Sequence, residues 1–263
     1  MKRILSAIAA ALLTAALLAG CAGGSSGGKK LTVGVRKNLA NFSSYSEEAD
    51  TYYGFEADLA EALAKEMGYS GVKFVGLDPE ERESALENGQ VDCLIAAFSY
   101  TESRAEKFDL STPYYHDAGR VMVEKSTLFS DYADLKNSTV AVRSGTTARD
   151  NLAAKLQADG LIRSAADLEG FLNIAEYTSY EEMNAALEYG DADALCADGC
   201  ITLPWLDEER AYFEEAYSQE DYVIATAKGS RLTAKAETAL TALSENGTLT
   251  KLETKWGVTN EEK

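Results

Sequence analysis

The chain has 263 residues and a formal net charge of −18, and 46% of its residues are hydrophobic. This composition is typical of a globular protein, and the length allows two modest domains. Because the body is so acidic, we expect no binding to nucleic acid and no electrostatic attraction to anionic lipid head groups.

The N-terminus has the pattern of an export signal that ends at a cysteine. Lys2 and Arg3 precede an apolar run over residues 4–19, which is short for a membrane span. Small residues follow and then Cys21, a pattern that resembles the bacterial lipobox. By this resemblance residues 1–20 are a lipoprotein signal peptide, and Cys21 carries lipid such as palmitate that anchors the protein to the membrane. Cleavage elsewhere and a buried cysteine are the alternatives.

Residues 21–29 are rich in glycine and serine and predict a flexible tether, so the folded body begins near residue 30. No second long apolar run follows, which places the body outside the membrane. The body has three cysteines, and this odd count argues against a complete disulfide framework. Whether Cys196 and Cys200 pair is left open. His116 is the single histidine, and the sequence contains no recognisable metal-binding cluster or cofactor motif.

Strand and helix patterns alternate along the first part of the body. Helices are predicted over residues 55–67, where apolar residues recur every fourth position, and over residues 79–88. Strands are predicted at 31–35, 72–77 and 91–97. This alternation indicates parallel strands joined by crossover helices.

The third strand leads into residues 96–104, which indicate a binding site for a small carboxylate. Thr101 is a suitable N-cap for a short helix, and Arg104 falls in the first turn of that helix. A cation is unfavourable at this end of a helix unless an anion occupies the site. Free N–H groups, the Ser99 hydroxyl and the guanidinium would then converge on one carboxylate. The alternative is a solvated arginine among neighbouring glutamates.

The same alternation repeats in the second part of the chain. Strands are predicted at 139–143, 172–175 and 192–196. Helices are expected to begin after Thr147 and at Ser179, which starts a capping box. The repeat indicates a second unit of the same α/β class.

Two further apolar strands, 121–123 and 222–225, bracket this second unit, and residues 232–256 predict two helices. If the two terminal helices pack on the first unit, the second unit is an insertion, and the bracketing strands form a hinge. The expected organisation is then lobe 1 from residues 30–123 and 224–263, and lobe 2 from residues 124–223.

Seven short motifs, in order and at family spacing, resemble those of the extracellular solute-binding proteins, family 3, of polar amino-acid ABC transporters. The match covers nearly all of the chain after the signal. The motifs lie at residues 54–60, 89–92, 101–104, 109–115, 144–147, 191–194 and 255–257.

This resemblance implies an α/β, two-lobed, periplasmic-binding-protein-like fold of type II, with two parallel-sheet lobes joined by two crossover strands. It implies a monomer that binds a free amino acid in the cleft, closes about its hinge and docks on an ABC-transporter permease in the cytoplasmic membrane. The protein would be extracytoplasmic, at the cell surface or in the periplasm.

Carried over by position, Arg104 pairs bidentately with the α-carboxylate of the ligand. Ser99 and the backbone of Thr146 and Thr147 complete that pocket. Asp198 lies where the family has an acid that binds the α-ammonium group. A zwitterion leaving water must have both charges met, and Arg104 and Asp198 lie in different lobes. Full pairing therefore requires a closed cleft.

Two more positions carry over. The Ala97 carbonyl would assist the acid at the ammonium group, although some family members have serine here, so one polar contact is missing. Phe42 matches an aromatic or apolar position in the wall of the pocket.

Two arginines bear on the side chain of the ligand. Arg36 ends the first strand and faces the cleft mouth, and Arg82 aligns with an arginine of members that resemble acidic amino-acid binders. In so acidic a protein, two further arginines near the cleft would favour a second carboxylate. Glutamate or aspartate is therefore the first choice, and glutamine the next. For Arg82 the alternative is charge balance with neighbouring glutamates.

Two other functions stay open at this point. Some relatives are similar to cyclohexadienyl dehydratases, but no serine–histidine arrangement is visible around His116, and we expect no enzymatic activity. A sensor domain for the same amino acid would differ only in the receptor to which it signals.

Overall fold

The computed structural model describes residues 28–258, which are organised around one nine-stranded sheet. Eight strands follow the order β5-β1-β6-β12-β7-β10-β8-β9, and β11 pairs with the end of β7. The strands are β1 (Leu31–Arg36), β5 (Val72–Leu77), β6 (Cys93–Leu94), β7 (Phe108–Glu124), β8 (Thr139–Arg143), β9 (Asn173–Tyr177), β10 (Ala194–Asp198), β11 (Arg210–Tyr212) and β12 (Ser218–Ala227).

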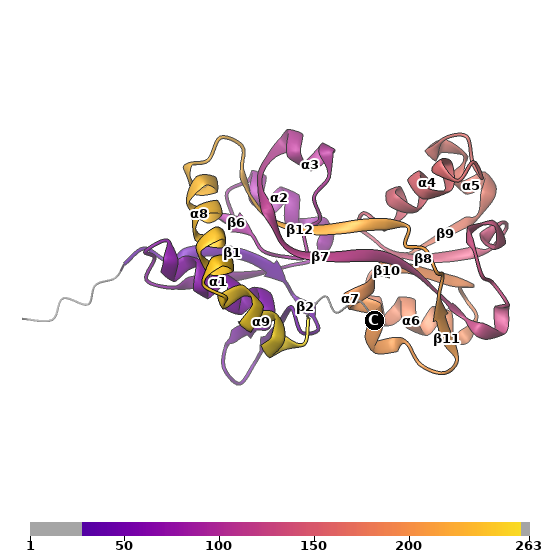
Figure 1. Cartoon of the computed structure of the whole chain (residues 1–263), viewed down its shortest axis with the longest axis horizontal. Coiled ribbons are helices and arrows are strands. Elements are labelled where there is room, and N and C mark those ends of the chain that lie inside the picture. Colours follow the sequence, from indigo (N-terminus) through magenta and orange to yellow (C-terminus); the bar gives the residue numbers. More distant parts are fainter. Residues whose placement is uncertain (1–27, 259–263) are drawn as a thin grey trace, which may run out of the picture.

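The sheet has two parallel parts, as the alternation of strands and helices predicts. β1 pairs in parallel with β5 and β6, and β8 pairs in parallel with β9 and β10. The long strands β7 and β12 pair with each other in antiparallel fashion and run between the two parts (Figure 1). We refer to the part around β1 as the first half and to the part around β8 as the second half.

The helices cover both halves. They are α1 (Phe55–Glu66), α2 (Arg82–Glu87), α3 (Glu102–Lys107), α4 (Ala148–Ala158), α5 (Leu168–Phe171), α6 (Tyr180–Tyr189), α7 (Gly199–Thr202), α8 (Arg231–Glu245) and α9 (Thr248–Trp256). Two of the predicted caps are present, because the Thr101 and Ser179 side chains accept hydrogen bonds from the third residue of α3 and α6.

The C-terminal helices pack back on the first half. In Figure 1, α8 and α9 lie beside α1 at the end of the molecule away from β8 and β9. Leu240 and Leu243 of α8 belong to the same buried cluster as Leu59 and Leu63 of α1. The tail therefore packs on the first half, which is the condition under which the second unit is an insertion. In the second half, α4 supplies Leu152 to a separate buried cluster.

The local structure departs from the sequence prediction in one strand and adds to it in two places. The strand expected at 91–97 shortens to β6 (Cys93–Leu94), and the chain then turns at Ala97, whose φ is 45°. The strand expected at 121–123 is present and is the end of the 17-residue β7. The segment before α1, for which no element was predicted, forms a small separate sheet of β2 (Asn38–Leu39), β3 (Ser43–Ser46) and β4 (Thr51–Tyr53).

The cysteine question is also settled for the described residues. Cys93, Cys196 and Cys200 are all free thiols. Burial raises the pKa of Cys93 to about 12, so this thiol is protonated at neutral pH.

Gly54, directly before α1, is a position where only glycine fits. Its φ is +128°, and a Cβ atom there would collide with the carbonyl group of Phe42. We expect Gly54→Ala to lower the free energy of unfolding by about 1–3 kcal/mol from the backbone conformation alone. Urea unfolding measures this. The control is Gly170→Ala. Gly170 has an ordinary φ and open space around the added methyl group, so this substitution should not destabilise the protein.

Candidate functional site

Arg104 is buried at the start of α3. The Thr101 hydroxyl accepts a hydrogen bond from its backbone N–H (3.1 Å), and its guanidinium lies 3.9 Å from the ring centroid of Phe98. Nη1 donates to the Ser99 carbonyl (2.7 Å), and Nε donates to Glu83 (3.3 Å). Among residues 28–258, Nη2 has no hydrogen-bond partner. The guanidinium is thus fixed by its neighbours, while both N–H groups of Nη2 and one of Nη1 are left for another acceptor.

The turn that precedes α3 has an unusual backbone. Ala97 has a φ of 45°, in the left-handed region that non-glycine residues rarely adopt. The buried carboxylate of Glu56 accepts a hydrogen bond from its N–H (2.6 Å), and Arg82 donates to its carbonyl (2.6 Å). Burial raises the pKa of Glu56, while the hydrogen bond from Tyr114 opposes that rise. The Ala97 carbonyl, expected to assist an ammonium group, has one lone pair left for that role.

A second turn, residues 144–147, meets the first through Arg82. The same guanidinium that contacts Ala97 also donates to the Gly145 carbonyl (3.1 Å). Thr146 and Thr147 follow at the start of α4, an eleven-residue helix. The N-terminus of such a helix presents free N–H groups and the positive end of the helix dipole. Of the two predicted backbone donors, the Thr146 N–H already donates to the Arg143 carbonyl (3.4 Å), which leaves the N–H of Thr147 at this end of the helix.

Three carboxylates lie close together where β7, β10 and β12 meet. In the sheet, Glu220 pairs with Asp117, and Asp198 pairs with Gly119, two residues further along β7. The Tyr222 hydroxyl donates a hydrogen bond to Asp198. Burial raises the pKa of Asp198 well above its ordinary value, and the carboxylates of Glu220 and Asp117 raise it further.

Arg104 and Asp198 share one electrostatic environment. Burial lowers the pKa of Arg104, and the carboxylates of Glu83, Glu220 and Asp198 oppose that effect. On the other side, Arg82 opposes the rise in the pKa of Asp198. Arg104 donates to the Ser99 carbonyl, and Ser99 forms a β-bridge with Tyr222. The Tyr222 hydroxyl in turn donates to Asp198, so two residues connect the predicted charges.

Arg36 borders a cavity between the two halves. The cavity has a volume of about 220 Å³. The Arg36 side chain is buried, its guanidinium lies 5.7 Å from the ring centroid of Tyr180, and its Nε has no hydrogen-bond partner among the described residues. The charged residues of the lining are three cations and two carboxylates: Arg36, Lys37, Arg143, Asp78 and Glu181.

Phe42 is buried next to the carboxylate cluster. Its ring makes edge contacts with Tyr115 (5.2 Å between centroids) and Tyr222 (5.9 Å). It therefore supports the tyrosine that bonds to Asp198. The lipid site predicted at Cys21 lies outside the described residues.

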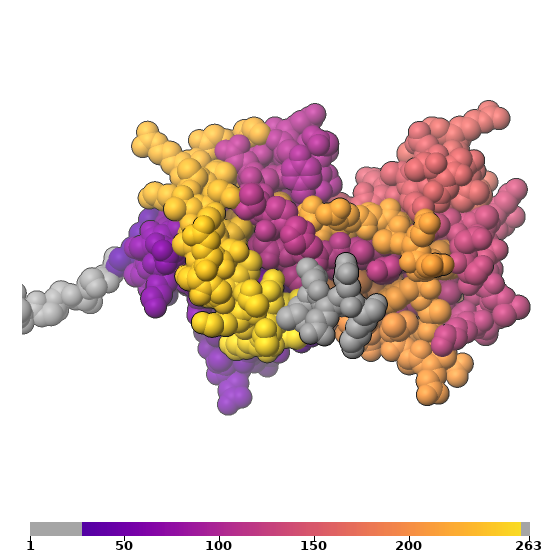
Figure 2. Space-filling view, viewed as in Figure 1, coloured from indigo at the N-terminus to yellow at the C-terminus, as the bar shows by residue number. Residues whose placement is uncertain are grey.

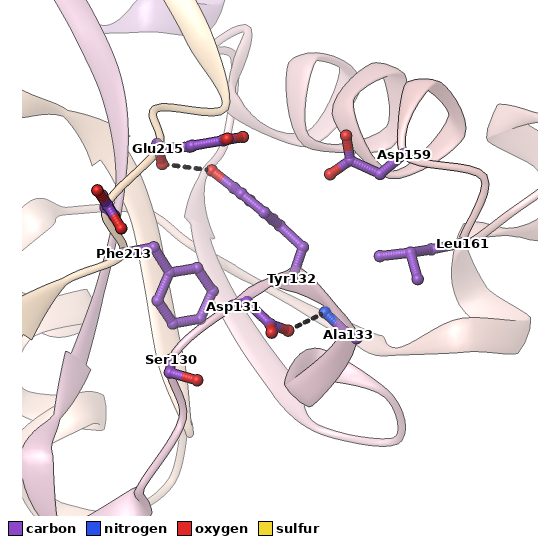
Figure 3. Close-up of a pocket in the computed structure, with 9 residues that line it drawn as sticks. Ser130, Asp131, Tyr132, Ala133, Asp159, Leu161, Phe213 and Glu215 are labelled. Atoms are coloured by element: carbon purple, nitrogen blue, oxygen red, sulfur yellow. Dashed lines mark hydrogen bonds between the residues drawn. The ribbon is translucent and has the colours of Figure 1, made fainter.

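Figure 2 shows a recess between the part that carries α3 and the part that carries α4, with β12 on its floor. A different hollow, of about 450 Å³, lies on the second half and is lined by Asp131, Tyr132, Asp159 and Glu215 among others. Its polar groups are satisfied locally, since Tyr132 donates to the Glu215 carbonyl and Asp131 accepts from the N–H of Ala133 (Figure 3). None of the predicted site residues lines it.

Four residues near the site were missed by sequence reasoning. Glu56 lies inside a recognised motif, and a carboxylate among the apolar residues of a helix is a signal that it has a buried partner. Glu220 and Tyr222 lie on β12, and Tyr180 follows the predicted cap of α6. Their roles depend on how separate segments meet, which the sequence pattern does not show.

Within residues 28–258, no helix is both long and apolar enough to cross a bilayer. The same residues contain no group of three or more histidine, cysteine, aspartate or glutamate side chains placed to hold a metal ion.

The fold and the position of the site define a class of binding protein with two α/β halves, and comparison with known proteins gives the family. The family model for bacterial extracellular solute-binding proteins, family 3, matches residues 31–259. The chain belongs to this family, as its motifs predict.

Individual relatives agree with this assignment. A glutamine-binding protein of Geobacillus stearothermophilus is 28% identical over 207 residues, which are 77% of this chain and 74% of that protein. The arginine-binding extracellular protein ArtP of Bacillus subtilis is 29% identical over 232 residues, 87% of this chain and 86% of that protein. These relatives are named as binding proteins and not as enzymes.

A solved structure gives the same fold. An ancestral arginine-binding protein bound to arginine matches with a TM-score of 0.73 and 28% identity, over 86% of this chain and 97% of that chain. With the sheet order above, this likeness confirms the predicted two-lobed fold of type II.

Proposed function

We propose that this protein binds a free amino acid between its two halves and delivers it to an ABC-transporter permease. Family membership supports extracytoplasmic solute binding, and the relatives named for glutamine and arginine support an amino acid. The observation that carries the proposal is the connection of Arg104 to Asp198 through Ser99 and Tyr222. A zwitterion requires one buried cation and one buried anion at close range.

In this proposal the α-carboxylate lies on Arg104, with Ser99 and the backbone of Thr146 and Thr147 around it. Asp198 binds the α-ammonium group with help from the Ala97 carbonyl. Phe42 contributes to the wall by its packing on Tyr222. Each charge of the ligand then meets an opposite charge that is already partly desolvated.

The two halves act as lobes in the proposal. Residues 30–123 and 224–263 form lobe 1, residues 124–223 form lobe 2, and β7 and β12 supply the hinge between them. A ligand shifts such a pair of lobes toward closure only as far as it binds the closed form better. Contacts from α3 on one side and from α4 and β10 on the other supply that preference.

We further propose glutamate or aspartate as the ligand, with glutamine second. Arg36 supports this choice, because its unpartnered Nε borders the cavity that also receives Arg143 and Lys37. Arg82 adds positive charge behind the first turn. Lys37 and Arg143 already pair with Asp78 and Glu80, so Arg36 is the cation of the lining that has no carboxylate partner among the described residues. An arginine ligand would place a second unpaired cation beside it, which like-charge repulsion disfavours.

A ligand screen with an Arg36 variant tests the choice. Bound ligand raises the melting temperature by mass action, so glutamate and aspartate should give the largest shifts among the twenty amino acids. In Arg36→Met, the binding free energy of the acidic ligand should weaken by about 2 kcal/mol, which raises its Kd roughly thirtyfold. The Kd for glutamine should change much less.

The matched control for this screen is Arg163→Met, because Arg163 is exposed and lies outside the cavity. Tightest binding of a cationic amino acid by the parent protein would contradict the acidic ligand while leaving amino-acid binding intact. Failure of all twenty to bind would contradict the proposed function itself.

The cellular arrangement completes the proposal. A monomer anchored by lipid at Cys21 would hold the binding domain outside the cytoplasmic membrane, with residues 21–29 as tether. Mass spectrometry of the membrane-extracted protein tests the anchor, and Cys21→Ala should release the protein into the soluble fraction.

A further inference from the structure

Arg82 is bonded almost entirely to main-chain carbonyl groups. Its side chain is 2% exposed. Nε donates to Pro79 (3.1 Å), Nη1 donates to Ala96 (2.9 Å) and Ala97 (2.6 Å), and Nη2 donates to Gly145 (3.1 Å). A guanidinium has five N–H donors, so four of them are used by the backbone.

This arrangement is electrostatically costly. Burial, followed by repulsion from Arg104 and Arg36, lowers the pKa of Arg82 to about 9. No carboxylate of residues 28–258 lies within ion-pair distance of it, although other buried arginines such as Arg104 and Arg210 have one. A charge buried in this way must be compensated by the hydrogen bonds that it makes. We therefore expect those bonds to hold parts of the backbone in one conformation.

The bonds to the first half fix the turn before α3. Ala97 adopts its left-handed conformation with Glu56 on its N–H and Arg82 on its carbonyl. Two residues later, the Ser99 carbonyl accepts from Nη1 of Arg104. The conformation of this turn therefore sets where the Arg104 guanidinium points.

The bond to the second half reaches the turn before α4. Gly145 has a φ of +72°, and a Cβ atom at this residue would lie 2.5 Å from the backbone N of Glu80. The backbones of the two halves thus touch here without an intervening side chain. Thr146 and Thr147 come next, so a hydrogen bond to the Gly145 carbonyl also restrains the position of the N-terminus of α4.

We propose that Arg82 is a positioning residue that joins the two binding turns when the halves are closed, so that Arg104 and the N-terminus of α4 face one ligand carboxylate together. This inference rests on the proposed function, because it concerns the same carboxylate. Arg82 acts through the turns at residues 96–99 and 144–147. Its effect is therefore the same for every amino acid that the protein binds.

A second link between the halves serves as a comparison. Nη1 of Arg143 lies 3.3 Å from the carboxylate of Glu80, but the Glu80 side chain is 48% exposed. Exposed ion pairs contribute little because water screens them and the side chains lose freedom. Arg143 also borders the cavity beside Arg36, so Glu80→Gln is the cleaner way to remove this pair.

The experiment compares Arg82→Met, Arg82→Lys and Glu80→Gln in the full chain by stopped-flow binding and small-angle X-ray scattering. The probes are the best-binding amino acid of the parent and one neutral amino acid that it also binds. We expect Arg82→Met to raise the dissociation rate at least tenfold for both probes and to leave the liganded protein more extended than the parent. Arg82→Lys should recover only part of the loss, because one ammonium cannot reach both turns. Glu80→Gln should stay within threefold of the parent.

Gly145→Ala keeps the test decisive if Arg82→Met does not fold. This residue is exposed, and the added methyl group blocks the approach to Glu80 without changing the bonds of Arg82 within the first half. It should give the same faster dissociation and the same extended liganded form.

Three outcomes would overturn the inference while the parent still binds its amino acid. Parent-like dissociation in Arg82→Met would remove any positioning role. A loss confined to the acidic probe would make Arg82 a direct ligand contact. An effect of Arg82→Met without one of Gly145→Ala would limit Arg82 to the first turn. A parent that binds no amino acid overturns the proposed function instead.

Discussion

Arg104→Ala is expected to remove most of the affinity for amino acids. The guanidinium is buried against Phe98 and bonded to the Ser99 carbonyl, so water cannot readily take its place. Truncating one partner of a buried, hydrogen-bonded charge pair costs about 2–5 kcal/mol. The Kd should therefore rise by a factor of roughly 30 to several thousand. Isothermal titration calorimetry with the best ligand of the parent protein measures this.

Two further variants sharpen the Arg104 result. Arg163→Ala removes an exposed arginine and should leave the Kd within about twofold. Arg104→Lys should also bind weakly, because an ammonium cannot offer two parallel donors to one carboxylate. Unchanged affinity of Arg104→Ala for every amino acid that the parent binds would show that the carboxylate lies elsewhere.

Asp198→Asn is expected to have opposite effects on binding and on stability. The amide cannot neutralise an ammonium group, so affinity should fall by about 2–5 kcal/mol. Without ligand, the substitution removes a charge that burial and the carboxylates of Glu220 and Asp117 disfavour. The free energy of unfolding at pH 7 should therefore increase. Urea unfolding and calorimetry on the same preparations measure the two effects.

The pH dependence follows from the same raised pKa. Above pH 3.8, the ordinary value, the unfolded chain loses the proton of Asp198 while the folded protein keeps it. The folded state then binds more protons, so stability falls as the pH rises toward the folded pKa. Ligand ammonium favours the ionised carboxylate, so affinity should rise over the same interval, with release of a proton.

Asp191→Asn is the matched control, because Asp191 is exposed in the turn before β10. It should change neither the affinity nor the slope of stability against pH. Buried Glu56 and Asp117 also have raised pKa values, so they too make the stability fall as the pH rises. The contribution of Asp198 is therefore the difference in the slope of stability against pH between variant and parent. A less stable Asp198→Asn protein would contradict the electrostatic argument.

Much of the fold could be predicted because local patterns and tertiary packing agree. The apolar stripe of α1 and the glycine after it predict a helix that ends within a residue of the observed one. Only the end of β7 was foreseen, at 121–123, because Pro113 and the polar residues around His116 interrupt the apolar pattern that marks a strand. Its pairing with β12 and β10, not its own sequence, keeps it extended.

The sequence proposes the charged residues of the site but not their bonds. Arg104 stands in the motif at 101–104 and Asp198 follows the motif at 191–194, so both were proposed by position. The sequence around Arg82 gives no sign that its donors go to carbonyls of four separate residues. The same holds for Ala97, since a continuous apolar run looks identical whether its backbone is extended or left-handed.

The central position of β12 has a consequence for biosynthesis. This strand lies between β6 and β7, yet it is built from residues 218–227, close to the end of the chain. A growing polypeptide therefore lacks the middle of its sheet until residues 218–227 have left the ribosome, and contacts of such long sequence separation form slowly. An export machinery that threads unfolded chains would meet this protein before it can fold.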